Sequence, residues 1–158
     1  MILISHRGNI NGRNIEKEND PEQVWRALDL GYEVEIDIWC VKNNWFLGHD
    51  TPFYCIALQW IYDLGDKLWL HCKNEEALEF LNEPQKYFPW APKLNYFWHQ
   101  NDDYTLTSNG HVWVYPGKSL TYNSICVLPE QSPSPYETSK LKQCAGICSD
   151  VIERYKDL

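Results

Sequence analysis

Acidic and apolar residues alternate through segment 32–38, which reads Tyr-Glu-Val-Glu-Ile-Asp-Ile. Side chains of a β-strand point alternately to its two faces, so this pattern predicts a strand with Glu33, Glu35 and Asp37 on one face. Carboxylates this close repel one another unless a cation neutralises them. The segment therefore indicates a divalent-cation site, although on its own it could also be the solvent-facing side of an antiparallel strand.

Histidine and basic side chains end the other strand-like runs. The first run ends in His6 and Arg7, a short later run is followed by His49, and a third ends with His71 and Lys73. Any one of these alone could be an ordinary hydrogen-bonded or solvated side chain. The carboxyl ends of parallel strands meet at one edge of a sheet, so together they predict an acid, a base and phosphate-binding charges around the cation.

Runs that favour strands alternate with runs that favour helices. Asp20 before Pro21 is typical of a helix start, and Gly31 of its end. Residues 43–44 predict a tight turn from which a short strand returns as a hairpin. The expected strands are 2–6, 32–39, 45–47, 68–73, 96–100, 112–115, 125–128 and 146–150. The expected helices are 21–30, 56–64, 75–81 and 150–155.

This alternation favours an α/β fold with a mainly parallel sheet, built as a single domain over 1–158. Seven main strands and the return strand are enough for barrel-like closure. A standard eight-fold α/β barrel needs about 250 residues, and this chain has 158. We therefore expect a compact, distorted TIM-like (β/α) barrel with shortened or missing helices, and an open sheet is the alternative.

The charge balance bears on partners. There are 14 Lys and Arg against 22 Asp and Glu, a formal net charge of −8. This balance argues against nucleic acid, which rewards clustered basic residues, and against adhesion to anionic lipid. No apolar run is long enough to span a bilayer and no signal peptide precedes the first strand, so a cytoplasmic protein is expected. The sequence makes no prediction about oligomeric state.

The order of the short motifs resembles the glycerophosphodiester phosphodiesterase family, in a superfamily that also includes the sphingomyelinase D-type phospholipases. The opening motifs cover about the first 73 residues, and the closing segment looks like the family's last strand. The matching segments are His6-Arg7-Gly8, Glu18-Asn19, Glu35-x-Asp37, His49-Asp50, the strand ending in Lys73, and Ala145-Gly-Ile-Cys-Ser-Asp150.

The resemblance implies a distorted α/β barrel that cleaves phosphodiesters with two histidines and one divalent metal ion, Mg²⁺, Ca²⁺ or Mn²⁺. It also implies a role for each matching residue: catalysis for His6 and His49, metal binding for Glu35 and Asp37, and phosphate contact for Arg7 and Lys73.

The chain departs from the family pattern at His71, where the family usually carries a glutamate as third metal ligand. We expect His71 to take that place, and a histidine suits Mn²⁺ or Zn²⁺ better than Mg²⁺ or Ca²⁺. Alternatively, Glu130 or Asp150 completes the metal shell, or metal binding is weak. The chain also lacks much of the middle of the family's barrel, which leaves the alcohol parts of the substrate open.

The expected function is that of a metal-dependent phosphodiesterase acting on a glycerophosphodiester-like or related small phosphodiester. If water attacks, the enzyme is a phosphoric diester hydrolase. If a hydroxyl of the substrate attacks, it is a phospholipase D-like lyase that gives a cyclic phosphate. A non-catalytic phospho-ligand-binding module on the same scaffold is the alternative, although binding alone does not require two histidines. Tryptophans suggest a third class, a carbohydrate-binding module, but most should be core residues: Trp39, Trp45, Trp60, Trp69, Trp90, Trp98 and Trp113.

Overall fold

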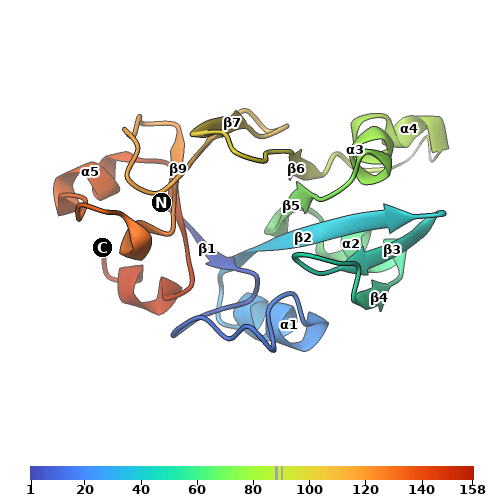
Figure 1. Cartoon of the computed structure of the whole chain (residues 1–158), viewed down its shortest axis with the longest axis horizontal. Coiled ribbons are helices and arrows are strands. Elements are labelled where there is room, and N and C mark those ends of the chain that lie inside the picture. The colour runs from blue at the N-terminus through green and yellow to red at the C-terminus, as the bar shows by residue number, and fades with distance from the viewer. Residues whose placement is uncertain (88, 90) are drawn as a thin grey trace.

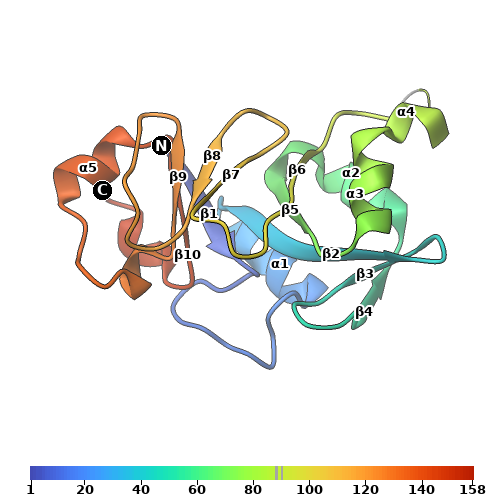
Figure 2. The same ribbon diagram turned by 45° about the horizontal axis from the view of Figure 1, so that its top comes forward.

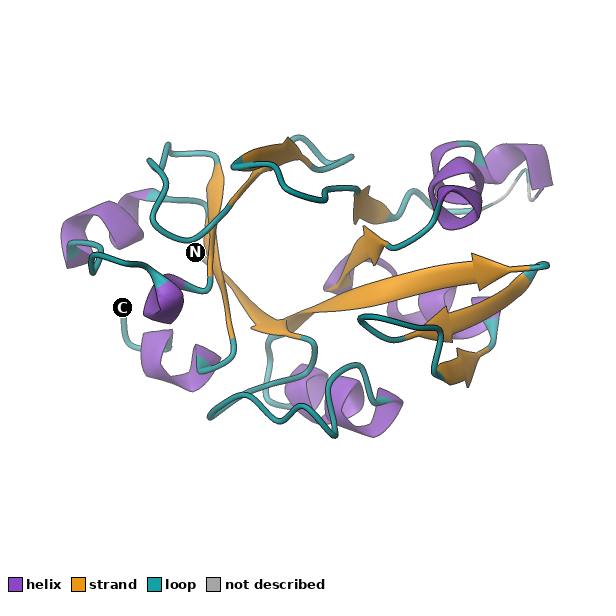
Figure 3. Ribbon diagram, in the orientation of Figure 1, coloured by secondary structure: helices purple, strands orange, loops and turns teal. Residues whose placement is uncertain are grey.

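The computed structural model describes residues 1–87, 89 and 91–158, and its strands join in one ten-stranded mixed sheet (Figures 1 and 3). The strands are β1 (Ile2–His6), β2 (Glu33–Val41), β3 (Asn44–Leu47), β4 (Tyr54–Ile56), β5 (Leu68–Cys72), β6 (Asn95–Phe97), β7 (Tyr104–Leu106), β8 (Val112–Val114), β9 (Ser124–Val127) and β10 (Gly146–Ser149). The α-helices are α1 (Pro21–Asp29), α2 (Leu58–Leu64), α3 (Glu75–Asn82), α4 (Pro84–Tyr87) and α5 (Thr138–Gln143), and 3₁₀ turns occur at Gly65–Lys67, Pro129–Gln131 and Ile152–Tyr155.

Seven strands run parallel, in the order β6-β5-β2-β1-β10-β9-β8. β7 is antiparallel to β8, and β3 and β4 extend β2 as antiparallel strands. The long strand β2 pairs with β1 near its start and with β3 near its end, while β5 occupies its other edge. The carboxyl ends of the parallel strands therefore come together on one side of the molecule.

The prediction of a compact, distorted TIM-like (β/α) barrel is wrong. The fold is α/β, but the sheet curls into a half-barrel dominated by strands, with few helices (Figures 1 and 2). Within the described residues no strand ladder joins β6 to β7 or β8, although Ser108 N donates a backbone hydrogen bond to Tyr96 O at 2.8 Å. A (β/α) barrel places a helix after each strand, whereas β6, β7 and β8 follow one another through turns and have three residues each. Strands this short leave the sheet unclosed.

The predictions of single strands and helices were more accurate than the prediction of a barrel. β1 has the predicted bounds, and α1 begins as predicted, with Asp20 accepting a hydrogen bond from Glu22 N at 2.9 Å. The hairpin is present, but the residues with positive φ are Lys42 and Asn43, so its turn comes one residue earlier than predicted. The helix expected at 150–155 is a 3₁₀ turn. None of the helices in the described part of the chain has the length and apolar character that crossing a bilayer requires.

The alternation in β2 separates two apolar layers. Val34, Ile36 and Ile38 face outward into the larger core, which includes residues of α1 and α3. The opposite face of β2 lines the inside of the curl and carries the carboxylates. A smaller apolar cluster fills the inside beneath them: Ile4, Trp69, Phe97, Trp113, Ile125, Val127 and Cys148. The carboxylates therefore lie on an apolar floor, in surroundings that favour interactions between charges.

Candidate functional site

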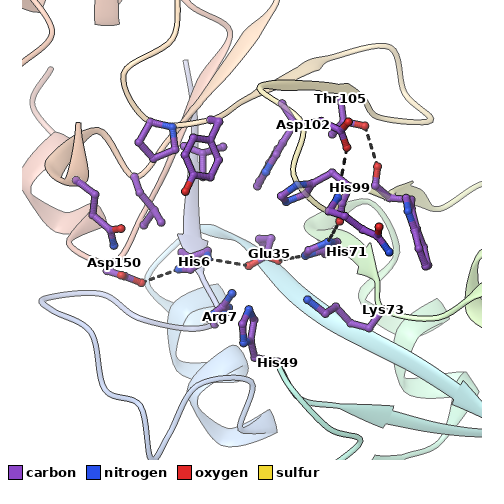
Figure 4. A pocket seen from close by; sticks show the side chains of 18 of the residues that line it. His6, Arg7, Glu35, His49, His71, Lys73, His99, Asp102, Thr105 and Asp150 are labelled. Carbon is purple, nitrogen blue, oxygen red and sulfur yellow. Dashed lines mark hydrogen bonds and ion pairs between the residues drawn. The ribbon is translucent and has the colours of Figure 1, made fainter. Parts of the chain in front are cut away.

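A cavity of about 480 Å³ opens inside the curl, at the carboxyl ends of the parallel strands (Figure 4). The sheet register explains why polar side chains meet there, because His6 pairs with Glu35 across β1 and β2, and Asp37 pairs with His71 across β2 and β5. Seven residues were given a catalytic, metal-binding or phosphate-binding role from the sequence, and six of them line the cavity: His6, Arg7, Glu35, His49, His71 and Lys73. The seventh, Asp37, is completely buried and contacts three of them.

Glu35, Asp37 and His71 form one buried group, with a potential ligand atom of each within 4.8 Å of the others. Burial raises the pKa of Glu35, and the neighbouring Asp37 carboxylate raises it further. Burial would also raise the pKa of Asp37, but His71, Arg7 and Lys73 hold that pKa well below its usual range. Asp37 is therefore an anion compensated by its neighbours, whereas burial and Asp37 together outweigh the favourable charges around Glu35.

The atom that a cation would satisfy is Glu35 Oε2. It is buried and has no hydrogen-bond partner among the described residues, its nearest charged neighbour being His6 Nε2 at 3.8 Å. An unpaired buried carboxylate oxygen is costly, and a metal ion removes the cost. Two carboxylates and an imidazole are a common donor set for a divalent cation. These residues therefore fit the cation that the resemblance implies.

His6 forms a dyad with Asp150, the residue that follows β10. His6 Nδ1 lies 2.7 Å from Asp150 Oδ1, and Asn9 Nδ2 donates to the same oxygen at 2.8 Å. Glu130 accepts a hydrogen bond from Asp150 N at 2.9 Å, which orients the turn. Burial lowers the pKa of His6, but Asp150 and Glu35 outweigh it and the net shift is upward. The other ring nitrogen, Nε2, lies on the side of Glu35, 3.8 Å from Oε2.

Glu130 and Asp150 were the alternative third metal ligands, and the structure gives both of them other partners. Asp150 orients His6, and Glu130 holds the turn after β10 through Ser149 Oγ and Asp150 N. In the sequence, Asp150 could be recognised only as an acidic residue at the end of the last predicted strand. The sequence alone did not show that this acid pairs with a histidine 144 positions away.

Arg7 and Lys73 both approach Asp37. Arg7 Nε lies 2.8 Å from Asp37 Oδ2, Arg7 Nη1 donates to Glu18 Oε2 at 3.0 Å, and Lys73 Nζ lies 3.4 Å from Asp37 Oδ1. Arg7 has a left-handed backbone with φ of 53°, a strained conformation for a residue with a side chain. Arg7 N donates to Glu35 O, which fixes this bend next to the site.

Asn19 holds the other end of that bend, and the sequence assigned it no role of its own. It donates to Asp37 Oδ2 at 3.0 Å and accepts from Asp37 N at 2.9 Å, with its own φ at 63°. Asn19 N also donates to Arg7 O. Glu18 and Asn19 therefore act together, and we call them the bracket. Glu18 holds the Arg7 guanidinium, and Asn19 holds the Asp37 carboxylate.

His49 lies on the more open side of the cavity, with 40% of its side chain exposed. Its Nδ1 lies 2.7 Å from Asp50 Oδ1, and burial together with the charge of Arg7 lowers its pKa. The preceding Gly48 has φ of 150°, and a side-chain carbon there would meet Thr51 O at 2.2 Å. Trp39 Nε1 donates to Gly48 O at 2.6 Å, which ties this turn to β2.

The opposite wall of the cavity is aromatic and comes from segment 98–116. Trp98, His99, Gln100, Tyr115 and Pro116 all line the cavity on this side. Among the tryptophans considered for sugar stacking, Trp45, Trp69 and Trp113 are buried, and Trp39, Trp60 and Trp98 are partly buried. Trp90 lies outside the described residues. Of the six described tryptophans on that list, three are thus core residues, and Trp60 and Trp98 pack against the core from partly exposed positions.

Comparisons with protein-family models, with characterised proteins and with solved structures find no match to this chain.

Proposed function

We propose that this protein is a metal-dependent phosphodiesterase that cleaves a small phosphodiester, of the glycerophosphodiester type or related to it, by acid–base catalysis with two histidines. One observation carries the proposal. A single cavity combines an oriented His6–Asp150 dyad, a second histidine, and a buried carboxylate with an unpartnered oxygen beside two basic side chains. The motif resemblance supports the same activity.

The cation would be held by Glu35, Asp37 and His71, and it would supply positive charge for a phosphate oxygen. Arg7 and Lys73 bind the phosphate from the same side, Arg7 through its planar guanidinium and Lys73 as a point charge. Asp150 holds His6 Nδ1, so His6 moves a proton at Nε2. His49 is the second proton carrier, at the solvent-facing side of the cavity. One histidine takes the proton of the attacking hydroxyl or water, and the other gives a proton to the leaving oxygen.

The test is cleavage of bis(p-nitrophenyl) phosphate and of a glycerophosphodiester by the whole protein, with Mg²⁺, Mn²⁺ or Ca²⁺ and with a chelator. We expect turnover that the chelator removes and that is lost in His6→Ala. The matched control is His111→Gln, because His111 does not line the cavity. A cyclic phosphate among the products would identify the lyase, and a monoester the hydrolase. No turnover of either substrate with any of the three cations would contradict the proposal.

One observation favours the second candidate, a module that binds a phosphorylated ligand without cleaving it. The cations Arg7 and Lys73 already lie beside Asp37, so the protein itself compensates part of the acidic cluster. Such a module would bind a non-hydrolysable phosphodiester in calorimetry and leave it intact. Binding with no turnover would therefore support the module, and turnover would exclude it.

A further inference from the structure

The two ring nitrogens of His71 face different chemical groups. Nε2 lies 3.3 Å from the backbone oxygen of His99, while Nδ1 lies 3.0 Å from Asp37 Oδ1 and 3.8 Å from Glu35 Oε1. A carbonyl oxygen can only accept a hydrogen bond, so Nε2 carries the hydrogen. The backbone of His99 thus turns Nδ1 toward the two carboxylates, as the outer partner of a metal-binding histidine does.

Neighbouring rings hold the imidazole in this orientation. The His71 ring is nearly parallel to that of Phe97, with centroids 5.0 Å apart and 9° between planes, and to that of His99, at 4.6 Å and 11°. His71 is buried, with 7% of its surface exposed. Turning the ring over would break the contact with His99 O and would bring the other nitrogen to the carboxylates. The orientation of Nδ1 is therefore built into β5 and the segment after β6.

With its hydrogen on Nε2, His71 can face two carboxylates at Nδ1 in two ways: as an imidazolium that donates to Asp37 Oδ1, or as a neutral ring with a metal cation between the three groups. The first leaves Glu35 unsatisfied, and the second does not. Glu35 Oε2, in the same group, is buried without a hydrogen-bond partner. We infer that the group selects divalent transition-metal ions, from Mn²⁺ to Zn²⁺, over Mg²⁺ and Ca²⁺, with His71 Nδ1 as the selecting donor. This inference rests on the cation of the proposed function, but it concerns binding and not turnover.

The selectivity follows from the chemistry of the donors. Mg²⁺ and Ca²⁺ are hard cations that take oxygen ligands, whereas imidazole nitrogen suits the first-row transition metals, with affinity rising from Mn²⁺ through Co²⁺. Two carboxylates would leave the hard cations and Mn²⁺ close in affinity. A nitrogen as third donor separates them, and the oxygen of a glutamate at the same position would bring them together again.

The experiment titrates the whole metal-free protein with each metal ion alone, by calorimetry, and records the visible absorption of the Co²⁺ complex. We expect one ion per chain and an affinity for Co²⁺ and Zn²⁺ at least about ten-fold above that for Mg²⁺. His71→Glu should lower the affinity for Co²⁺ by about 10- to 100-fold, the range seen when metal-site partners are changed. It should raise the affinity for Mg²⁺ and shift the Co²⁺ absorption. His111→Gln removes a histidine that does not line the cavity and should change nothing.

His71→Gln serves as a second variant if His71→Glu does not fold, and circular dichroism shows which variants are folded. Retained selectivity in either folded variant would overturn the inference, as would equal affinity of the wild type for Mg²⁺ and Co²⁺ or no binding of any ion. The proposed function fails separately. Tight, selective Co²⁺ binding without phosphodiester cleavage rejects the enzyme and keeps the inference, and cleavage with unselective binding does the reverse.

Discussion

The two sides of the curled sheet differ in how firmly they are built. On one side, β1, β2, β5 and β10 pair with three to five residues at each interface, and helices pack behind them. On the other, β6, β7 and β8 have three residues each and no helix between them. Within this second side, side-chain bonds help to join β6 to the segment after β7: Ser108 Oγ accepts from Tyr96 N at 2.9 Å and donates to Leu94 O at 3.1 Å.

The chemistry is divided between the two sides in the same way. The charged groups stand on the firm side, where strand register and the Asn19 bracket fix their geometry. The aromatic wall with Trp98 and Tyr115 belongs to the loosely joined side. Reacting groups need accurate placement, whereas a wall that only surrounds the substrate can adapt. Under the proposed function, the fold would thus separate catalysis from substrate fit.

Asp37→Asn should have the largest effect, because the basic side chains of the firm side converge on Asp37. The amide leaves Arg7, His71 and Lys73 facing a neutral group in a buried setting. Breaking a buried ion pair costs about 3–5 kcal/mol, so we expect a large loss of folding free energy together with loss of Mn²⁺ binding. Denaturant unfolding and calorimetry measure the two effects. Unchanged Mn²⁺ affinity would contradict the role of Asp37 as a metal ligand.

The second-largest effect is expected for replacement of the two histidines of the proposed acid–base pair. His6→Ala and His49→Ala should each reduce kcat by about 10²- to 10⁴-fold, the usual contribution of an acid or base, and the double variant should lose little more. Asp150→Asn should lose less than His6→Ala, and it should shift the pH profile because the amide no longer favours the charged imidazole. Steady-state kinetics across pH decide this, and near-normal turnover in either single histidine variant would remove that residue from the pair.

Trp98→Ala tests the aromatic wall. If the wall only surrounds the substrate, its loss weakens the ground state and the transition state equally, so KM should rise by about ten-fold with kcat nearly unchanged. The pattern should be the opposite of that in the histidine variants. A fall in kcat with constant KM would show that the second side also takes part in the chemistry.

Ser108→Ala tests how β6 is held to the segment after β7, within the second side. It removes the hydroxyl that bonds Tyr96 N and Leu94 O, at a cost of about 1–2 kcal/mol. In hydrogen exchange we expect faster exchange in 95–114 and no change in β1, β2 and β10. Ser139→Ala is the matched control, since Ser139 is exposed in α5. Equal loss of protection in β1 would mean that the two sides open together.

The smallest expected effect concerns Glu18, which belongs to the bracket. Burial would raise the pKa of Glu18, but Arg13 and Arg7 outweigh it and the net shift is below its ordinary value of 4.5. The unfolded chain therefore takes up a proton first, so the stabilisation is present above this value and is lost as the pH falls below it. Glu18→Gln should show a shallower loss of stability in acid than the wild type, measured by unfolding between pH 6 and pH 3. An equally steep loss would show that this carboxylate adds nothing.

Local patterns predicted most of the firm side and little of the loose side. The alternation in β2 and the motifs at the ends of β1 and β5 placed the charged residues in one cavity, because parallel strands bring their carboxyl ends together. Strands were correctly predicted near 96–100 and 112–115, where the structure has β6 and β8. Closure of a barrel depends on how many residues of those strands pair with each other, and no local pattern contains that information.

The dyad between His6 and Asp150 joins the first strand to the last across 144 positions of sequence. During synthesis, β1, β2 and β5 leave the ribosome long before β10, so Glu35, Asp37 and His71 can come together while His6 still lacks its partner. Contacts between segments so far apart form late, because the intervening chain must be ordered first. A nascent chain could hold a cation before it could move a proton. Reactivity would then appear only in a chain that has finished folding.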